Sequence, residues 1–185
     1  SVDGRLNEIR DGVDTQLAST VADINSYSTQ IAALNQRIIL AQAAGPTQPA
    51  NDLLDQRDQL VAQLNQQVRV STLTESDGSL SVFIGNGQAV VIGAQSYGLA
   101  TMQSGEDASR MTVGITVPGG GSAALPEAML SGGTLGGLLA FRRESLDTAQ
   151  NALGRIAVGL AETFNAQHRL GQDLTGAIGG NFFAA

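Results

Sequence analysis

The chain has 185 residues, of which 42% are hydrophobic, and a formal net charge of −7, with arginine as the only strongly basic residue type. That length can bury a real core in one ordinary domain or two small ones, and the composition excludes a disordered chain. An acidic surface without basic clusters argues against binding to nucleic acid or to anionic lipid. The absence of cysteine excludes disulfides, thiolate metal sites and cysteine nucleophiles.

The ends of the sequence carry no membrane or targeting signal. No run of about 18 apolar residues is present, and the first residues lack the charged-then-apolar pattern of a signal peptide. The sequence starts with Ser1 and stops at NFFAA. We therefore expect it to be a piece excised from a longer protein.

Residues 2 to about 43 are predicted to form one long helix. Apolar residues recur there at alternating spacings of four and three, which is typical of a helix packed along a seam. At about 1.5 Å per residue such a helix would be about 60 Å long, so we expect an elongated architecture. The seam comprises Leu6, Arg10, Val13, Leu17, Thr20, Ile24, Tyr27, Ile31, Leu34, Ile38 and Ala41.

A second, shorter helix is predicted over NDLLDQRDQLVAQLNQQVRV, residues 51–70, fading near Val68. The preceding AGPTQP contains Gly45, Pro46 and Pro49, which end the first helix and turn the chain back. Three acidic residues point away from the apolar stripe and read as a solvated face: Asp52, Asp55 and Asp58. The stripe itself comprises Leu53, Leu54, Leu60, Val61, Leu64 and Val68, with Arg57 at its centre.

Residues 68–125 change to a period of two, which indicates strands. Three alternating runs are separated by SDG and GNG, both strong hairpin-turn signals. Further strands are predicted at residues 97–102 and 111–117. We interpret PGGGS and LPEAMLSGG as linkers that return the chain to its helical part.

The last helix is predicted from about Thr134 to Leu170, with a second apolar seam and with Arg142 within it. Beyond Gly171 the sequence is rich in turn residues. The seam comprises Leu135, Leu139, Arg142, Leu146, Ala149, Leu153, Ile156, Leu160 and Phe164.

The sequence therefore predicts an α+β fold. We expect an elongated antiparallel bundle of long helices with a small antiparallel β unit inserted between the second and third helices. The helical rod would be discontinuous, built from residues 1–67 and 130–171. Residues 68–125 would form the β unit, and residues 172–185 would start a truncated following element.

No pattern indicates a catalytic, cofactor or metal site. His168 is the only histidine and sits at a helix C-terminus, where it suits the helix dipole. GNGQAV precedes a strand instead of a helix, so it reads as a hairpin turn and not as a dinucleotide fingerprint. PGGGS lacks the residues of a phosphate loop, and Asp173 alone cannot supply a calcium site.

Arg57 and Arg142 are the remaining candidates, because each places a charge within an apolar stripe. A buried charge must meet a carboxylate or carbonyl oxygens, or reach solvent along its own stem. The neighbours of Arg57 one turn away on its own helix are apolar, so its partner must come from another element. We favour a structural staple that sets helix register over a ligand-binding role, with Asn35 and Ser28 as further members of its network.

Several stretches resemble the flagellar hook-associated protein 1 family, whose members form the first hook–filament junction protein of bacterial flagella. They cover most of the chain and keep the order of the family. The quoted stretches are INSYSTQIAALNQRI, NDLLDQRDQLVAQLNQQVRV, FIGNGQAVVIG, GGTLGGLLAFRRESLDTAQNALGRIAVGLAETFNAQHRLG and the terminal NFF.

The resemblance implies a non-enzymatic structural subunit that links hook to filament and is required for filament assembly. It also implies an extracellular location, reached through the flagellar type III apparatus without a cleaved signal. The implied partners are other copies in the axial ring, the hook protein and the second junction protein. A generic coiled-coil adaptor, for example a phage tail component, is the alternative, and an enzyme is the least favoured reading. We expect the fragment to be monomeric at modest concentration.

Overall fold

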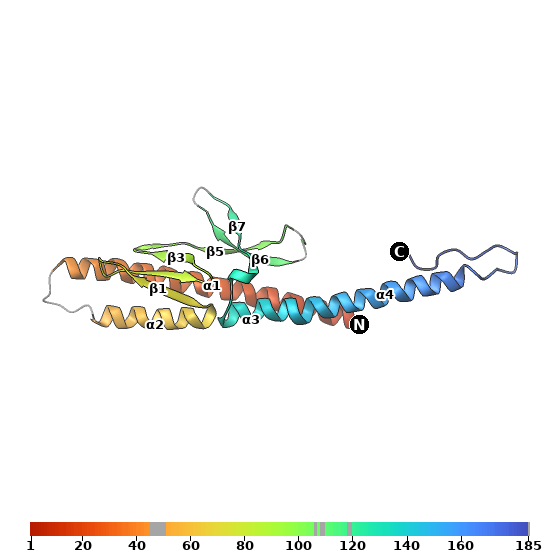
Figure 1. The fold of residues 1–185 in the computed structure, drawn as a ribbon, viewed down its shortest axis with the longest axis horizontal. Coiled ribbons are helices and arrows are strands. Elements are labelled where there is room, and N and C mark those ends of the chain that lie inside the picture. The colour runs from red at the N-terminus through yellow and green to blue at the C-terminus, as the bar shows by residue number, and fades with distance from the viewer. Residues whose placement is uncertain (45–50, 106, 108–109, 118–119, 185) are drawn as a thin grey trace. The chain divides into compact units, whose positions relative to one another are not determined.

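The computed structural model describes residues 1–44, 51–105, 107, 110–117 and 120–184, and it confirms the α+β class (Figure 1). Two compact units divide the chain. One combines Ser1–Arg10 with Phe141–Ala185, and the other is Asp11–Ala140. The predicted AGPTQP turn falls largely at residues 45–50, outside the described residues.

In the Asp11–Ala140 unit, helix α1 (Val2–Ala43) buries one continuous stripe, as its sequence predicted. The stripe follows the spacings of three and four that keep side chains on one side of a helix. The stripe also contains polar residues, Asn35 among them. The buried residues of α1 are Val13, Leu17, Thr20, Val21, Ile24, Ser28, Ile31, Ala32, Leu34, Asn35 and Ile38.

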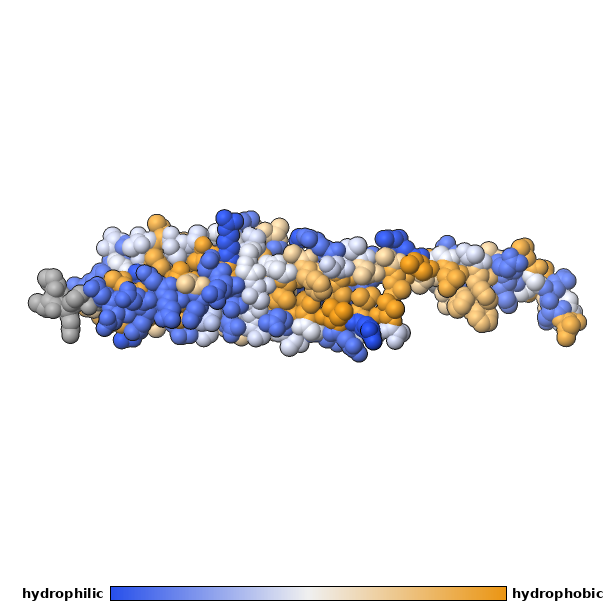
Figure 2. Space-filling model, turned by 90° about the horizontal axis from the view of Figure 1, so that it is seen from below, coloured by the Kyte–Doolittle hydropathy of each residue, from blue (hydrophilic) through white to orange (hydrophobic). Residues whose placement is uncertain are grey.

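Helix α2 (Asn51–Gln67) lies beside the second half of α1 and runs in the opposite direction (Figure 1). Arg57 and Leu64 are its only buried residues. Seen from below, the surface over α2 is mainly hydrophilic (Figure 2), and Asp52, Asp55 and Asp58 are exposed on it. The acidic residues of α2 therefore form a solvated face, as predicted.

A four-stranded antiparallel sheet follows, with the strand order β1-β2-β3-β4. Its strands are β1 (Val70–Thr74), β2 (Leu80–Ile84), β3 (Gln88–Ile92) and β4 (Gln95–Ser96). The predicted SDG and GNG turns connect the first three strands. Gly85 has a φ of 55°, and a Cβ there would lie 1.6 Å from the carbonyl oxygen of Met129, so only glycine fits.

A second sheet contains three antiparallel strands: β5 (Leu99–Gln103), β6 (Met111–Thr116) and β7 (Ser122–Ala124). The interpretation of PGGGS as part of a linker was wrong at its C-terminal end, because Ser122 begins β7. Positive φ angles at Gly120 and Gly121 turn the chain, and Val117 N–H donates to the Gly121 carbonyl at 3.2 Å. The sequence hid this strand because it is short and contains no branched residue.

The core of this unit lies between the helices and both sheets. Val82 and Ile84 of β2, and Val113 of β6, are completely buried in one apolar cluster with α1. A 3₁₀ turn (Glu127–Met129) then leads to helix α3 (Gly133–Phe141), whose Leu135 and Leu139 join the same cluster. One continuous core therefore contacts α1, α2, α3 and both sheets.

The predicted last helix begins with α3 but is interrupted by a π-helical turn at Arg142–Leu146 before α4 (Asp147–His168). Leu146 is buried, but Ile156, Leu160 and Phe164 remain 67%, 65% and 45% exposed. Beyond Leu146, the predicted apolar seam of α4 is therefore largely uncovered among the described residues of its unit. Among the residues described, no helix has the length and apolar character that a membrane crossing requires.

Gly85→Ala tests the close contact at the β2–β3 turn. We expect a loss of at least about 2 kcal/mol of unfolding free energy, because a Cβ would collide with the Met129 backbone in a left-handed conformation. Thermal denaturation should show a melting temperature about 4–8 °C lower. The control is Gly12→Ala, where a Cβ meets nothing within 4 Å. That variant should be equally or more stable, and equal losses in both would contradict the argument.

Candidate functional site

Arg57 lies on the buried side of α2 and is 6% exposed. Its Nη1 donates to the carbonyl oxygen of Gly78 at 2.9 Å and to Oδ1 of Asn35 at 3.2 Å. Gly78 lies in the turn before β2, and Asn35 lies on α1. The structure thus brings a carbonyl and an amide to Arg57 from outside its own helix.

Burial lowers the pKa of Arg57 from its ordinary value, and the nearby charge of Asp58 raises it in part. Its Nε is buried without a hydrogen-bond partner among the described residues. A cation held mainly by neutral oxygens is poorly compensated for its lost hydration. This arrangement is suited to holding elements in place.

Asn35 is completely buried and uses its whole amide. Its Nδ2 donates to the carbonyl oxygens of Leu80 (2.8 Å) and Gly93 (2.7 Å). Its Oδ1 accepts from Leu80 N–H (3.0 Å) and from Arg57. An amide has two donor hydrogens and two acceptor lone pairs, so every hydrogen-bonding position of Asn35 is filled.

Asn25, which precedes Asn35 on α1, makes the same kind of contact with the second sheet. Its Oδ1 accepts from Leu99 N–H at 2.8 Å, and its Nδ2 donates to the Leu99 carbonyl at 2.9 Å. Leu80 begins β2 and Leu99 begins β5. Each of the two sheets is therefore held to α1 by one asparagine that binds the backbone of a first strand residue.

Ser28, which the sequence placed in the same network, does not join it. The residue is 1% exposed, but its hydroxyl oxygen has no hydrogen-bond partner among the described residues. Asn25 was missed because it falls off the centre of the apolar stripe and is only half-buried. A search for asparagines on the sheet-facing side of α1 would have found it.

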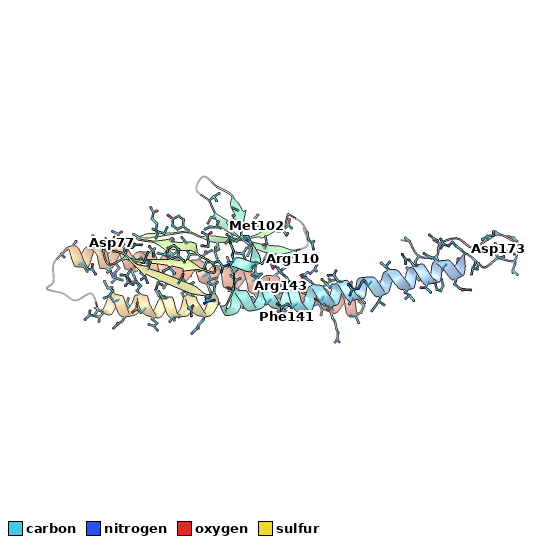
Figure 3. All side chains as sticks on the ribbon, viewed as in Figure 1. Asp77, Met102, Arg110, Phe141, Arg143 and Asp173 are labelled. Atoms are coloured by element: carbon cyan, nitrogen blue, oxygen red, sulfur yellow. The ribbon has the colours of Figure 1, made fainter. Side chains whose placement is uncertain are left out.

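Asp77 organises the turn that presents the Gly78 carbonyl to Arg57 (Figure 3). Its Oδ1 accepts hydrogen bonds from the Ser79 hydroxyl (2.6 Å) and the Ser79 N–H (2.9 Å). These bonds, the hydroxyl's first, hold the pKa of Asp77 below its ordinary value. The charged form of Asp77 thus stabilises this turn.

Arg142 lies in the other unit, within the π-helical turn, and is 1% exposed. Arg142 takes part in at least one polar, ring or electrostatic interaction. Because Arg57 and Arg142 belong to different units, each is a separate candidate. The staple role assigned to both arginines stays a prediction.

The C-terminal segment of the same unit is held to α4 by a third asparagine. Asn165 is 5% exposed, and its Oδ1 accepts from the N–H groups of Phe182 (2.8 Å) and Phe183 (2.9 Å). Its Nδ2 donates to the Phe183 carbonyl at 2.9 Å. Phe164, Phe182 and Phe183 contact one another through their rings, with centroids 5.1–5.3 Å apart. Apart from the terminal NFF, no sequence pattern indicated this contact.

His168 and Asp173 each make local contacts with residues of the C-terminal segment. Nδ1 of His168 lies 2.7 Å from the Gly180 carbonyl oxygen, and its ring lies near those of Phe164 and Phe182. Asp173 (Figure 3) accepts from the Thr175 hydroxyl and from the N–H groups of Thr175 and Ala177. These bonds lower the pKa of Asp173, so it is an organiser of the turn.

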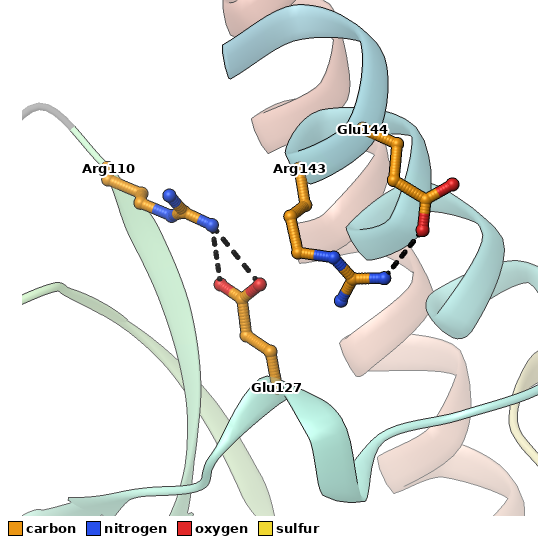
Figure 4. Close-up of polar contacts among 4 residues, drawn as sticks. All are labelled: Arg110, Glu127, Arg143 and Glu144. Carbon is orange, nitrogen blue, oxygen red and sulfur yellow. Dashed lines mark hydrogen bonds and ion pairs between the residues drawn. The ribbon is translucent and has the colours of Figure 1, made fainter. Parts of the chain in front are cut away.

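Figure 4 shows two ion pairs, Arg110–Glu127 and Arg143–Glu144. Nη2 of Arg110 contacts both carboxylate oxygens of Glu127, at 3.2 and 3.3 Å, and joins the start of β6 to the 3₁₀ turn. Arg143 contacts the adjacent Glu144 at 2.7 Å, where both side chains are more than half exposed. An exposed pair such as Arg143–Glu144 contributes little to stability, whereas the side chains of Arg110 and Glu127 are only 29% and 20% exposed.

The described residues show neither a metal-ligand cluster nor titratable groups gathered in the groove between α1 and α2. No three of their histidine and acidic side chains gather where a metal could bind. The groove between α1 and α2 has one ionisable residue, Arg37, and otherwise glutamine, alanine and leucine. Its lining is Gln30, Ala33, Leu34, Arg37, Gln56, Gln59, Leu60 and Gln63. General acid–base chemistry needs titratable groups that converge, and this groove lacks them.

Comparison with known proteins gives a consistent family. The family model described as "Flagellar hook-associated protein FlgK helical domain" matches residues 1–183. Flagellar hook-associated protein 1 of Escherichia coli (strain K12) is 41% identical over 172 residues, covering 93% of this chain and 31% of that relative. The protein of the same name from Bacillus subtilis (strain 168) is 26% identical over 200 residues, covering 96% and 39%.

A solved structure agrees with these sequence relatives. The flagellar hook junction protein FlgK from Burkholderia pseudomallei superimposes with a TM-score of 0.85 at 44% identity. The match covers 98% of this chain and 32% of that chain. The chain therefore spans about a third of the length of these relatives.

Substitutions at Arg57 test whether it acts as a staple. We expect Arg57→Leu to keep or raise the melting temperature, because leucine fills the stripe without a desolvated charge. Arg57→Ala should lower the melting temperature by about 4–8 °C, because it removes the hydrogen bonds to Asn35 and Gly78 and also leaves a cavity in the stripe. Differential scanning calorimetry measures both. Unchanged melting temperatures in both variants would contradict the staple.

The two turn carboxylates predict a dependence of stability on pH. Their folded-state pKa values are lower than the ordinary 3.8, so each stabilises the fold above that pH. This contribution is lost as the pH falls through the lowered pKa. Asp77→Asn and Asp173→Asn should therefore lower the melting temperature at pH 7, and the difference from wild type should shrink below about pH 4. Asp55→Asn, at an exposed site on α2, is the charge-matched control. A difference independent of pH would contradict the assignment.

Proposed function

Because the chain belongs to the flagellar hook-associated protein FlgK helical domain family, we propose that it is part of a structural subunit at the hook–filament junction of a bacterial flagellum. In this role it links hook to filament and is required for filament assembly. The observation that carries the proposal is the match over residues 1–183, together with a solved hook junction protein at 44% identity.

The polar contacts of the chain support a mechanical role. Asn25 and Asn35 hold both sheets to α1 through paired hydrogen bonds to strand backbones. Arg57 adds α2 to the same network. Hydrogen bonds from these side-chain amides to the strand backbones resist sliding of the sheets against the helix. A subunit that transmits torque between its neighbours needs this resistance to sliding, and it does not need a binding cleft.

The partners in this proposal are other copies of the protein in an axial ring, the hook protein and the second junction protein. The helices would form an elongated antiparallel rod that resists bending, with the β unit available for lateral contacts. The location would be extracellular, reached by export through the flagellar type III apparatus. No cofactor or metal is part of this function, and neither nucleic acid nor membrane is a partner.

A generic coiled-coil adaptor, such as a phage tail component, is disfavoured by the family match. Such a module would share the helical spacing of α1 and α4. It would give no reason for 41% identity to flagellar hook-associated protein 1 over 93% of the chain. An enzyme is likewise disfavoured, because the groove between α1 and α2 has Arg37 as its one ionisable residue and no metal-ligand cluster occurs among the described residues.

Deletion of the gene for the full-length protein in its own bacterium tests the proposal. Cells should assemble hooks but no filaments, and should stop swimming. The full-length gene should restore both, as should a matched gene with the exposed substitution Glu8→Gln. A gene lacking the region of residues 1–183 should restore neither. Electron microscopy and swimming assays measure the result, and normal filaments in the deletion strain would overturn the proposal.

A further inference from the structure

The outer edge of β1 lies beside no other strand among the described residues, because β1 ends the strand order of its sheet. The inner edge bonds to β2 through the odd-numbered residues. Gly85 N–H donates to the Arg69 carbonyl at 3.0 Å, and Glu75 N–H donates to the Ser79 carbonyl at 2.9 Å. In an antiparallel pair such residues alternate with residues whose backbone groups point outward. The outward residues are therefore Val70, Thr72 and Thr74.

Only the start of this outer edge is covered. The N–H of Val70 donates to Oδ1 of Asn65 on α2, at 3.0 Å, which confirms that Val70 points outward. Beyond it, the N–H groups of Thr72 and Thr74 and the Val70 and Thr72 carbonyls have no partner among the described residues. Four residues of β1, Ser71 to Thr74, are exposed in a row. Both faces of β1 are thus accessible there.

The sequence of β1 lacks the usual protection of an edge strand. Exposed edges are commonly blunted by lysine, proline, an inward charge or a bulge. VSTLT has none of these residues, its pairing with β2 is regular, and Leu73 is 56% exposed. An edge of this kind can accept a further strand, which gains backbone hydrogen bonds.

We propose that this edge binds a second copy of the chain, with β1 antiparallel to the partner's β1 about a two-fold axis at Thr72. In this register the N–H and carbonyl of Thr72 bond with the partner's Thr72. The N–H of Thr74 donates to the carbonyl of the partner's Val70. Pairing outward residues with outward residues is the pattern that an antiparallel ladder requires.

Charge complementarity selects a second copy as the occupant. The same register places Arg69 opposite the partner's Glu75, and Glu75 opposite the partner's Arg69. Both residues are exposed at the two ends of the strand. A self-complementary arrangement of opposite charges favours this pairing and disfavours a shifted one. Because the contact is two-fold, it closes as a dimer and differs from the head-to-tail contacts that an axial ring of copies needs.

The contact is small, so the dimer is weak. A pairing over one short strand buries far less surface than a stable interface needs, which places the dissociation constant at roughly 0.1–1 mM. The chain is then a monomer at low micromolar concentration and a dimer only when concentrated. The inference does not rest on the flagellar role, and its test uses no motility measurement.

Sedimentation equilibrium from about 10 μM to 1 mM tests the proposal. Wild type should show a monomer–dimer equilibrium. Thr72→Pro removes the central N–H at a position where β2 needs no donor, and it should abolish the dimer. Arg69→Glu places like charges opposite each other and should weaken the dimer at least about tenfold. Arg69→Glu combined with Glu75→Arg should restore it to within about threefold of wild type.

Arg5→Glu is the matched control, since it makes the same change in net charge on α1 and should leave dimerisation unchanged. Glu75 also accepts a hydrogen bond from the Ser81 hydroxyl, at 2.7 Å, so the melting temperature of each variant is measured beside its association. A wild type that stays monomeric to 1 mM would overturn the proposal. So would a dimer that survives Thr72→Pro and Arg69→Glu, because its contact would then lie on another surface.

Discussion

The side-chain amide of Asn35 is the contact on which the Asp11–Ala140 unit depends. It is completely buried, and it binds the backbone of Leu80, the carbonyl of Gly93 and the guanidinium of Arg57 at once. One residue of α1 thereby fixes the start of β2, the turn after β3 and the position of α2. Loss of this amide would leave several buried polar groups without partners, and each such group costs about 1–3 kcal/mol.

Asparagine is well suited to this task because its amide matches a peptide group. One donor and one acceptor on the same plane can hold both the N–H and the carbonyl of a single strand residue. Asn25 does so for Leu99, and Asn165 does the equivalent for Phe182 and Phe183 in the other unit. Each of these asparagines binds the backbone of an extended segment to a helix. The same physical solution therefore recurs in both units.

The position of the Arg57 side chain depends on Asn35, whose Oδ1 accepts a hydrogen bond from its guanidinium. Its guanidinium meets a carbonyl and an amide oxygen, and burial lowers its pKa. Neutral oxygens satisfy a cation only in part, so the contact contributes more to the register between α2 and its neighbours than to stability. Asp77 completes the set by shaping the turn that carries the Gly78 carbonyl. A rigid junction between helices and sheet follows from these contacts.

The sequence alone determined the helical regions, most of the strands and the resemblance to the family. Period-four-and-three spacing marked α1 and the α3–α4 region, alternation with SDG and GNG marked β1 to β3, and the central place of Arg57 was visible on the helical wheel. These features are local, so neighbouring residues are enough to read them. Only the tertiary structure decided that the strands form two sheets, that Ser122 begins the third strand of the second sheet, and that a π-helical turn interrupts the last helix.

The tertiary structure also decided which polar residues meet. Asn35 reaches Leu80 across 45 residues and Asn25 reaches Leu99 across 74, whereas the hydroxyl of Ser28 has no hydrogen-bond partner among the described residues. Partners that far apart in sequence are brought together by packing, and no local pattern records them.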